Sequence, residues 1–260
     1  MGGSELYAVE HHRDRSGPLV VLVHGGMDRS TSFAGLLRRL TDVHVLAYDR
    51  RGYARSRHVR PIARSVSEHA ADLLDLVAGR QAVVVGHSYG GDVALVAAIE
   101  RPDLVHAVAA FEAPTPWMPW WPADTAGERA TSAGSPAEAA EAFMRRVVGD
   151  RVWERLPART KAERRAEGEA LLAELASIRR GAPFDPAEVK VPVVVGYGTR
   201  TESHHRAGSE DLLAHLPDGE RFEINGAGHG AHVSHPDAFA AFVRTAVERG
   251  TRTRPARVVK

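Results

Sequence analysis

The chain has 260 residues, of which 43% are hydrophobic and 26% charged, and it contains no cysteine. This composition predicts a folded globular protein and excludes disulfides, thiolate metal sites and a cysteine nucleophile. The 34 basic and 33 acidic residues nearly cancel, so no net field favours nucleic acid, and no apolar run approaches the ~20 residues that span a bilayer. We therefore expect cytoplasmic residence, with neither a nucleic acid nor a membrane as partner.

Five short apolar runs predict buried strands. They span residues 18–24, 43–48, 81–86, 105–111 and 191–197. They are rich in valine and continuous rather than alternating, as expected for strands that are covered on both faces. Helical patterns at residues 32–40, 67–77, 91–99, 211–216 and 236–248 alternate with them. This order predicts an α/β fold with a mostly parallel sheet and right-handed crossovers.

The alternation of strands and helices stops between Pro114 and Gly181. This stretch begins with a segment rich in proline and tryptophan and continues as charged helices at residues 136–148 and 160–179. We expect a helical lid at residues 114–181, a core at residues 1–113 and 182–250, and a flexible tail at residues 251–260. The candidate substrate-binding residues, which could equally serve to pack the lid on the core, are Met27, Trp117, Met118, Trp120 and Trp121.

A G-x-S-x-G pentapeptide carries the strongest chemical signal. Gly86-His-Ser-Tyr-Gly90 follows a predicted strand and precedes a predicted helix. A sharp turn between these elements projects a serine hydroxyl out of the sheet, and small flanking residues make room for the turn. The helix N-terminus behind Ser88 presents backbone N–H groups that favour developing negative charge. Ser88 is therefore the predicted nucleophile.

A glycine-rich turn closes the first strongly apolar strand, with the sequence Val23-His-Gly-Gly-Met27. Such a turn lets a backbone N–H face the serine, so the N–H groups of Gly26 and Tyr89 are the predicted oxyanion hole. Taken alone, the turn could equally be a flexible loop between a strand and a helix. Its presence beside the serine motif favours the catalytic interpretation.

A histidine-rich loop lies near the C-terminus, between a short predicted strand at residues 221–224 and the last helix. His229 is flanked by glycines, where an imidazole can move beside the serine hydroxyl and accept its proton. His232 and His235 are the alternatives, each better explained as a capping or packing residue. His229 is therefore the predicted general base.

Four segments together resemble the α/β-hydrolase superfamily: His24-Gly-Gly, Asp49-Arg-Arg-Gly-Tyr-Ala-Arg-Ser56, Gly86-His-Ser-Tyr-Gly-Gly91 and Gly226-Ala-Gly-His229. Their order and spacing match over nearly the whole chain outside the lid. The resemblance implies an eight-stranded, mostly parallel sheet with the lid inserted after the sixth strand, and no cofactor. It also implies that Asp49 to Ser56 is a structural turn, so we assign Asp49 no catalytic role.

The sequence departs from the family pattern at the acid that orients the histidine. Members commonly carry an aspartate in a G-x-x-D loop after the seventh strand, where this chain has Gly198-Thr-Arg-Thr201. Some relatives carry the acid after the sixth strand, and Glu112 resembles that arrangement. We predict Glu112 as the acid, with a carboxylate oxygen within about 2.6–3.2 Å of a His229 ring nitrogen. Glu202, next to the substituted position, is the alternative.

These residues predict a serine hydrolase that cleaves an ester, thioester or lactone bond of a small molecule through an acyl-enzyme. One alternative is an acyl transferase, cyclase or lyase that keeps Ser88 but excludes water. Another is a non-catalytic ligand-binding protein that has lost its acid at Thr201. We expect no metal site, because the histidines near the C-terminus form neither H-E-x-x-H nor a clustered set with aspartates.

Overall fold

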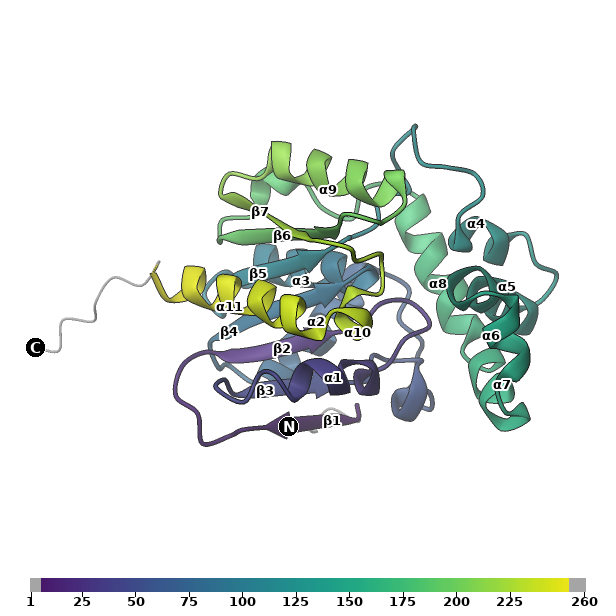
Figure 1. Cartoon of the computed structure of the whole chain (residues 1–260), viewed down its shortest axis with the longest axis horizontal. Coiled ribbons are helices and arrows are strands. Elements are labelled where there is room, and N and C mark those ends of the chain that lie inside the picture. Colours follow the sequence, from purple (N-terminus) through teal and green to yellow (C-terminus); the bar gives the residue numbers. More distant parts are fainter. Residues whose placement is uncertain (1–5, 253–260) are drawn as a thin grey trace, which may run out of the picture.

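A seven-stranded sheet forms the centre of the computed structural model, which describes residues 6–252 (Figure 1). The strand order is β1-β3-β2-β4-β5-β6-β7, and β1 is antiparallel to β3 while all other neighbours are parallel. The strands are β1 (Ala8–His11), β2 (Leu19–Val23), β3 (Val45–Tyr48), β4 (Ala82–His87), β5 (Val105–Phe111), β6 (Val193–Gly198) and β7 (Gly219–Ile224).

Each face of the sheet has its own apolar core. Successive side chains of a strand point to opposite faces, so Val21 of β2 joins one core and Val20 joins the other. The first core is covered by α2 (Val66–Val77) and α3 (Tyr89–Glu100), the second by α1 (Ala34–Leu37) and α11 (Pro236–Arg252), and α9 (Ser203–His215) contacts β6 and β7. Burial on both faces explains why the strands from β2 to β6 are continuous apolar runs.

Five helices lie between β5 and β6 and gather at one end of the molecule (Figure 1). They are α4 (Ala126–Thr131), α5 (Pro136–Val148), α6 (Asp150–Arg155), α7 (Ala158–Arg165) and α8 (Gly168–Arg179). This helical insertion has a small core of its own, in which the fully buried Trp153 packs near Met144 and Leu171. Met27 and Tyr53 from the main body join the same cluster, so the insertion is attached to the body by apolar contacts.

Serine side chains fix where two of the helices begin. The hydroxyl of Ser65 accepts a hydrogen bond from the backbone N–H of Glu68 at 3.1 Å, and that of Ser135 accepts one from Glu138 at 3.3 Å. Each bond satisfies an N–H group that has no partner inside the helix. The remaining short elements are the 3₁₀ turns η1 (Ser30–Phe33), η2 (Ala54–Ser56) and η3 (Pro186–Glu188) and the single-turn helix α10 (Ala231–Ser234).

Two details of the predicted architecture are wrong. The sheet has seven strands within residues 6–252 rather than eight, and the helical insertion follows the fifth strand, β5, rather than the sixth. Both differences arise before β2, where β1 is the single strand described and lies antiparallel at the sheet edge. The sequence did not mark β1, because it is a partly exposed edge strand held by pairing with β3 rather than by an apolar run.

The described helices of the insertion all fall within the predicted lid at residues 114–181. The division into core, lid and tail stays a prediction. Helix α11 includes Thr251 and Arg252 of the predicted tail, and residues 253–260 lie outside the described part of the chain. No helix within residues 6–252 is both long enough and apolar enough to cross a membrane.

Asp92 lies in the first turn of α3, close behind the turn that carries Ser88. Its side chain is fully buried, and neither carboxylate oxygen has a hydrogen-bond partner among the described residues. Burial raises the pKa of Asp92 well above its usual range, because no partner compensates for the lost hydration of the charged form. The folded chain therefore strongly favours the protonated, uncharged carboxyl group.

We expect Asp92→Asn to flatten the pH dependence of stability. The pKa of Asp92 is raised by folding, so the wild-type free energy of unfolding decreases as the pH rises above the unfolded-state value of 3.8. An amide does not ionise, so the urea midpoint of the variant should fall less steeply as the pH rises above 3.8. The exposed Asp75 on α2 provides the control, because Asp75→Asn should keep the wild-type slope. Equal slopes for Asp92→Asn and wild type would contradict the expectation.

Candidate active site

Ser88 occupies a strained turn between β4 and α3. Its φ of 53° and ψ of −130° are rarely adopted by residues other than glycine. The Ser88 N–H donates to the carbonyl of Phe111 at 2.8 Å, which ties the turn to the end of β5. Helix α3 begins at Tyr89, and the first N–H groups of a helix have no acceptor within it. These N–H groups therefore lie next to the serine side chain.

Close backbone contacts keep this turn sharp. A Cβ atom at Gly86 would lie 2.1 Å from the carbonyl oxygen of Gly90, and a Cβ atom at Gly90 would lie 2.3 Å from that of Val23. A Cβ atom at Gly25 would lie 2.9 Å from Cβ of Ser88. The turn, the end of β2 and the glycine-rich loop after β2 can approach one another only because these positions carry no side chain.

Glu112 and His229 meet at the carboxyl end of the sheet. Nδ1–H of His229 donates to Oε2 of Glu112 at 2.6 Å, within the distance range expected from the sequence. The carboxylate is fully buried, and it also accepts from the backbone N–H of Gly198 at 2.9 Å and from the hydroxyl of Thr201 at 2.8 Å. Three donors therefore compensate for the loss of water around this buried group.

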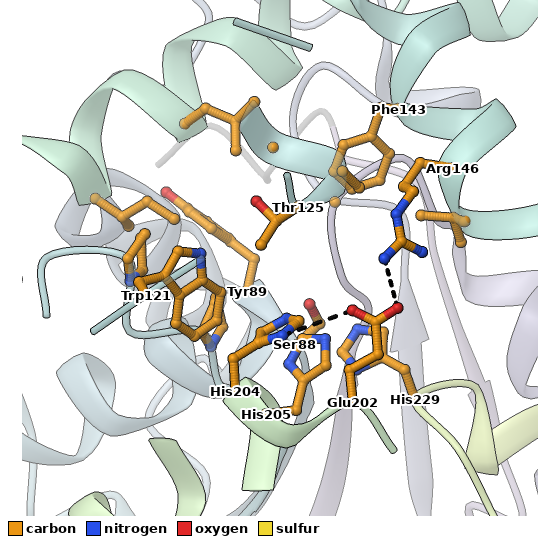
Figure 2. A pocket seen from close by; sticks show the side chains of 18 of the residues that line it. Ser88, Tyr89, Trp121, Thr125, Phe143, Arg146, Glu202, His204, His205 and His229 are labelled. Atoms are coloured by element: carbon orange, nitrogen blue, oxygen red, sulfur yellow. Dashed lines mark hydrogen bonds and ion pairs between the residues drawn. The ribbon is translucent and has the colours of Figure 1, made fainter. Parts of the chain in front are cut away.

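The alternative carboxylate, Glu202, does not reach His229. It accepts a hydrogen bond from Arg146 of α5 at 2.6 Å and lies 3.6 Å from Nδ1 of His204 (Figure 2). Thr201, at the position where the resemblance implies an aspartate, instead donates to Glu112. Glu112 is therefore the carboxylate that contacts His229.

Further imidazole rings surround His229. The ring of His205 stacks on it with centroids 4.2 Å apart and planes 12° apart, and His204 lies against His205 (Figure 2). On another side, Nε2–H of His87 donates to the carbonyl of His229 at 2.8 Å. Burial lowers the pKa of His205 and of His87 well below the usual value, and the neighbouring imidazoles add to the shift. Both rings therefore stay uncharged.

Ser88 and His229 line one cavity of about 270 Å³ between the sheet edge and the helical insertion. Within the described chain, they face the cavity without a direct hydrogen bond between them. Such bonds are often long or misaligned without a ligand and tighten when substrate binds. The predicted oxyanion residues Gly26 and Tyr89 also line this cavity. The insertion contributes Thr125, Phe143, Arg146, Leu171, Glu174, Leu175, Ile178 and Arg179 to its wall.

A buried ion pair links the glycine-rich loop to the insertion. The fully buried Arg50 donates to the carbonyls of His24 at 2.8 Å and Gly25 at 3.0 Å, and it pairs with Glu174 of α8. Although burial opposes ionisation, Arg50 lowers the pKa of Glu174 to about 2. Removing one partner of such a pair costs about 3–5 kcal/mol, because the other charge stays buried. The backbone around Gly26 therefore depends on a residue of the insertion.

The five predicted substrate-binding residues separate into different environments. Trp121 lines the cavity, with its ring 4.7 Å from that of His204. Trp117 instead packs against Phe184 and the main core. The side chain of Trp120 is 40% exposed, and Met118 lies outside the cavity wall. Met27 is buried in the core of the insertion. Consecutive turns, closed by bonds from Met118 to Thr115 and from Trp121 to Met118, separate the neighbouring tryptophans. Trp121 is therefore the member of the set that faces the cavity.

Arg50, Glu174 and His205 contact the site but were not predicted to belong to it. Arg50 lies in the turn from Asp49 to Ser56, and Asp49 itself accepts from the Ser30 hydroxyl at 2.6 Å, which agrees with a structural role. The sequence gives one indication that Glu174 is buried. It lies on the apolar stripe that Leu171, Leu175 and Ile178 form along α8. No sequence pattern places His205 against His229.

A model of the alpha/beta hydrolase family matches residues 20–242. The chain is 35% identical over 100 residues to a 2-(acetamidomethylene)succinate hydrolase of Mesorhizobium japonicum. The matched segment covers 37% of this chain and 36% of that protein. The chain is also 35% identical over 119 residues to epoxide hydrolase B of Mycobacterium tuberculosis, covering 43% of this chain and 33% of that protein. The chain thus spans about a third of the length of these curated relatives.

A solved structure shares the fold over a longer range. The enol-lactonase from Burkholderia xenovorans superposes with a TM-score of 0.69 and 22% identity, covering 94% of this chain and 96% of that one. At this level of identity, the likeness shows a common fold.

We expect Gly90→Ala to destabilise the fold, because its Cβ would collide with the backbone at the end of β2. The loss should be about 1–3 kcal/mol or more in the free energy of unfolding, measured by chemical denaturation. Gly230 offers a matched control beside the same site, since its φ is −84° and a Cβ there would meet nothing within 4 Å. Gly230→Ala should stay within about 0.5 kcal/mol of wild type. Equal stability of the two variants would show that close approach does not hold the turn.

Proposed function

This chain belongs to the alpha/beta hydrolase family, and on that basis we propose that it is a serine hydrolase that cleaves an ester-like bond of a small molecule. The observation that carries the proposal is the arrangement around one cavity: Ser88 on a strained turn at the start of α3, and His229 held by the buried carboxylate of Glu112. This arrangement fits the division of roles in nucleophilic acyl transfer.

The proton acceptor is Nε2 of His229. A carboxylate can only accept, so the bond to Glu112 fixes the proton on Nδ1 and leaves Nε2 with a lone pair. In the proposed mechanism, Nε2 takes the proton of the Ser88 hydroxyl as the serine oxygen attacks the carbonyl carbon of the substrate. Glu112 then stabilises the positive charge that forms on the imidazole.

The negative charge develops on the former carbonyl oxygen of the substrate. The N–H groups of Gly26 and Tyr89 are the proposed donors to this oxygen, one from the loop held by Arg50 and one from the N-terminus of α3. The intermediate collapses to an acyl-enzyme on Ser88 as the leaving group takes the proton from His229. Water, activated by the same histidine, then releases the acid and restores the serine.

The cavity supports a small substrate with an apolar portion. Its volume of about 270 Å³ lies near the lower end of the range for ligand pockets. Phe143, Leu171 and Ile178 of the insertion contribute apolar side chains to the cavity wall that also contains Ser88, so we assign the lid role to residues 114–181. The similarity to a hydrolase of 2-(acetamidomethylene)succinate also supports a small-molecule substrate.

We expect a fluorophosphonate probe to label the protein rapidly at Ser88, because the probe reports a serine activated by a base. Ser88→Ala should abolish labelling and lower the rate of ester hydrolysis by several orders of magnitude. Glu112→Gln should slow both by about 10³–10⁴-fold, because the amide no longer stabilises the charged imidazole. The measurements are the labelling rate and the release of nitrophenol from short-chain esters.

Glu202→Gln is the matched control, since Glu202 lines the same cavity but contacts Arg146 rather than His229. It should change the labelling rate by less than about tenfold. Folded wild-type protein that fails to react with the probe would indicate a ligand-binding protein. Labelling without release of product in water, but with transfer to an added alcohol or amine, would indicate an acyl transferase.

Trp121 should set the preference for the acyl group, because it lines the cavity while the adjacent Trp120 is partly exposed. Trp121→Ala enlarges the apolar space and should shift the ratio of kcat/KM values toward longer acyl chains by about tenfold, the effect of one or two methylene groups. Trp120→Ala should leave this ratio unchanged. A series of nitrophenyl esters of increasing chain length provides the measurement, and equal ratios in both variants would refute the assignment.

A further inference from the structure

Three metal-ligating side chains lie together behind the candidate active site. Asp28, His87 and His232 each offer one ligand atom, and these atoms lie within 4.8 Å of one another. Asp28 follows the glycine-rich loop, His87 ends β4, and His232 lies in α10. None of the three is part of the cavity wall around Ser88. The cluster is therefore separate from the proposed substrate site.

The hydrogen bonding of His87 leaves a lone pair for this cluster. A carbonyl can only accept, so the bond from Nε2 of His87 to the carbonyl of His229 fixes the proton on Nε2. Nδ1 then carries a lone pair, and it is buried without a hydrogen-bond partner in the described part of the chain. Histidines that bind metal ions typically donate their other ring N–H to a carbonyl or carboxylate in this way.

The two other side chains lie against each other, and Nδ1 of His232 is buried without a hydrogen-bond partner among the described residues. Oδ2 of Asp28 lies 3.4 Å from Nε2 of His232 and accepts a hydrogen bond from the hydroxyl of Ser32 at 2.9 Å. The ring of His232 is buried between the rings of Phe33, at 5.2 Å, and Phe239, at 6.0 Å. Asp28 keeps 22% of its side chain exposed, which gives an ion access from solvent.

Ring orientation distinguishes this cluster from a second group, formed by Glu112, His205 and His229. A bound metal ion lies near the plane of each imidazole that ligates it. The rings of His205 and His229 are stacked with planes 12° apart, so their lone pairs run side by side. The rings of His87 and His232 are 4.2 Å apart with planes 52° apart, which allows their lone pairs to converge on one point.

We propose that Asp28, His87 and His232 bind one divalent transition-metal ion, with Zn²⁺ as the best match to two imidazoles and one carboxylate. Each ligand is within three residues of a candidate catalytic group: Asp28 of Gly26, His87 of Ser88, and His232 of His229. The ion ties together the three segments that carry the oxyanion donor, the nucleophile and the base. Its role is to hold these segments, since its ligands do not reach the cavity. The site was not apparent in the sequence because its ligands are 59 or more residues apart.

The test is calorimetric titration of the full chain, stripped of metal with a chelator, with Zn²⁺. We expect one ion per chain and a higher Tm in its presence, because binding to the folded state alone stabilises it. Asp28→Asn and His232→Gln should each weaken binding by at least about tenfold. His235→Gln, three residues from His232, and Glu112→Gln, in the second group, should retain it. Ser88→Ala should also retain it, so the result is independent of the proposed hydrolase activity.

Co²⁺ provides a readout on wild-type protein that does not depend on how the variants fold. A four- or five-coordinate ion in the site should give stronger visible absorption than the hydrated ion, and Zn²⁺ should displace it. The proposal is overturned if wild-type protein binds no Zn²⁺, if Co²⁺ keeps the spectrum of the hydrated ion, or if folded Asp28→Asn and His232→Gln bind as wild type does.

Discussion

The backbone of the turn after β4 approaches the end of β2 so closely that no side chain fits between them. A Cβ atom at Gly90 would lie 2.3 Å from the carbonyl oxygen of Val23 in β2, and a Cβ atom at Gly86 would lie 2.1 Å from the carbonyl oxygen of Gly90 within the turn itself. The two glycines therefore permit the sharp turn at Ser88 and the close approach of the start of α3 to the end of β2. The geometry of the candidate site thus depends on the absence of side chains at positions 86 and 90. The other residues of the site lie around this contact.

Two charged side chains near this contact are buried, and each has several hydrogen-bond partners. Glu112 has three donors, and Arg50 has two carbonyls and a carboxylate. Arg50 and Glu174 are far apart in sequence, and their ion pair connects the loop after β2 to helix α8. The insertion therefore contributes both to the wall of the cavity and to the support of the glycine-rich loop.

The sequence was informative where function depends on local structure. The turn at Ser88 could be predicted because a strand, a sharp turn and a helix leave a short pattern. The contact of Glu112 with His229 could be anticipated because position 201 lacks a carboxylate and Glu112 resembles the acid that some relatives carry after the sixth strand. The start of α9 was placed too late, since its first turns carry histidine, arginine and glycine rather than an apolar stripe. The hydrophobic periodicity that indicates a helix is therefore absent from these first turns.

Features that depend on distant contacts could not be read in this way. Whether Trp117, Trp120 or Trp121 faces the cavity depends on two turns in a segment with no regular period. The edge strand β1 forms because it pairs with β3. His205 stacks on His229 because α9 packs against the sheet. In each case the residue type was visible in the sequence, but its neighbours were not.

Two of the ion pairs that join the insertion to the body differ in exposure, and this difference implies that they do not cost the same free energy to separate. Arg50 and Glu174 are 0% and 2% exposed, whereas Arg146 and Glu202 are 30% and 48% exposed. Separating the first pair would leave a charge without water, while separating the second costs at most about 1 kcal/mol. The contact between α5 and the start of α9 is therefore easier to separate than the contact between α8 and Arg50.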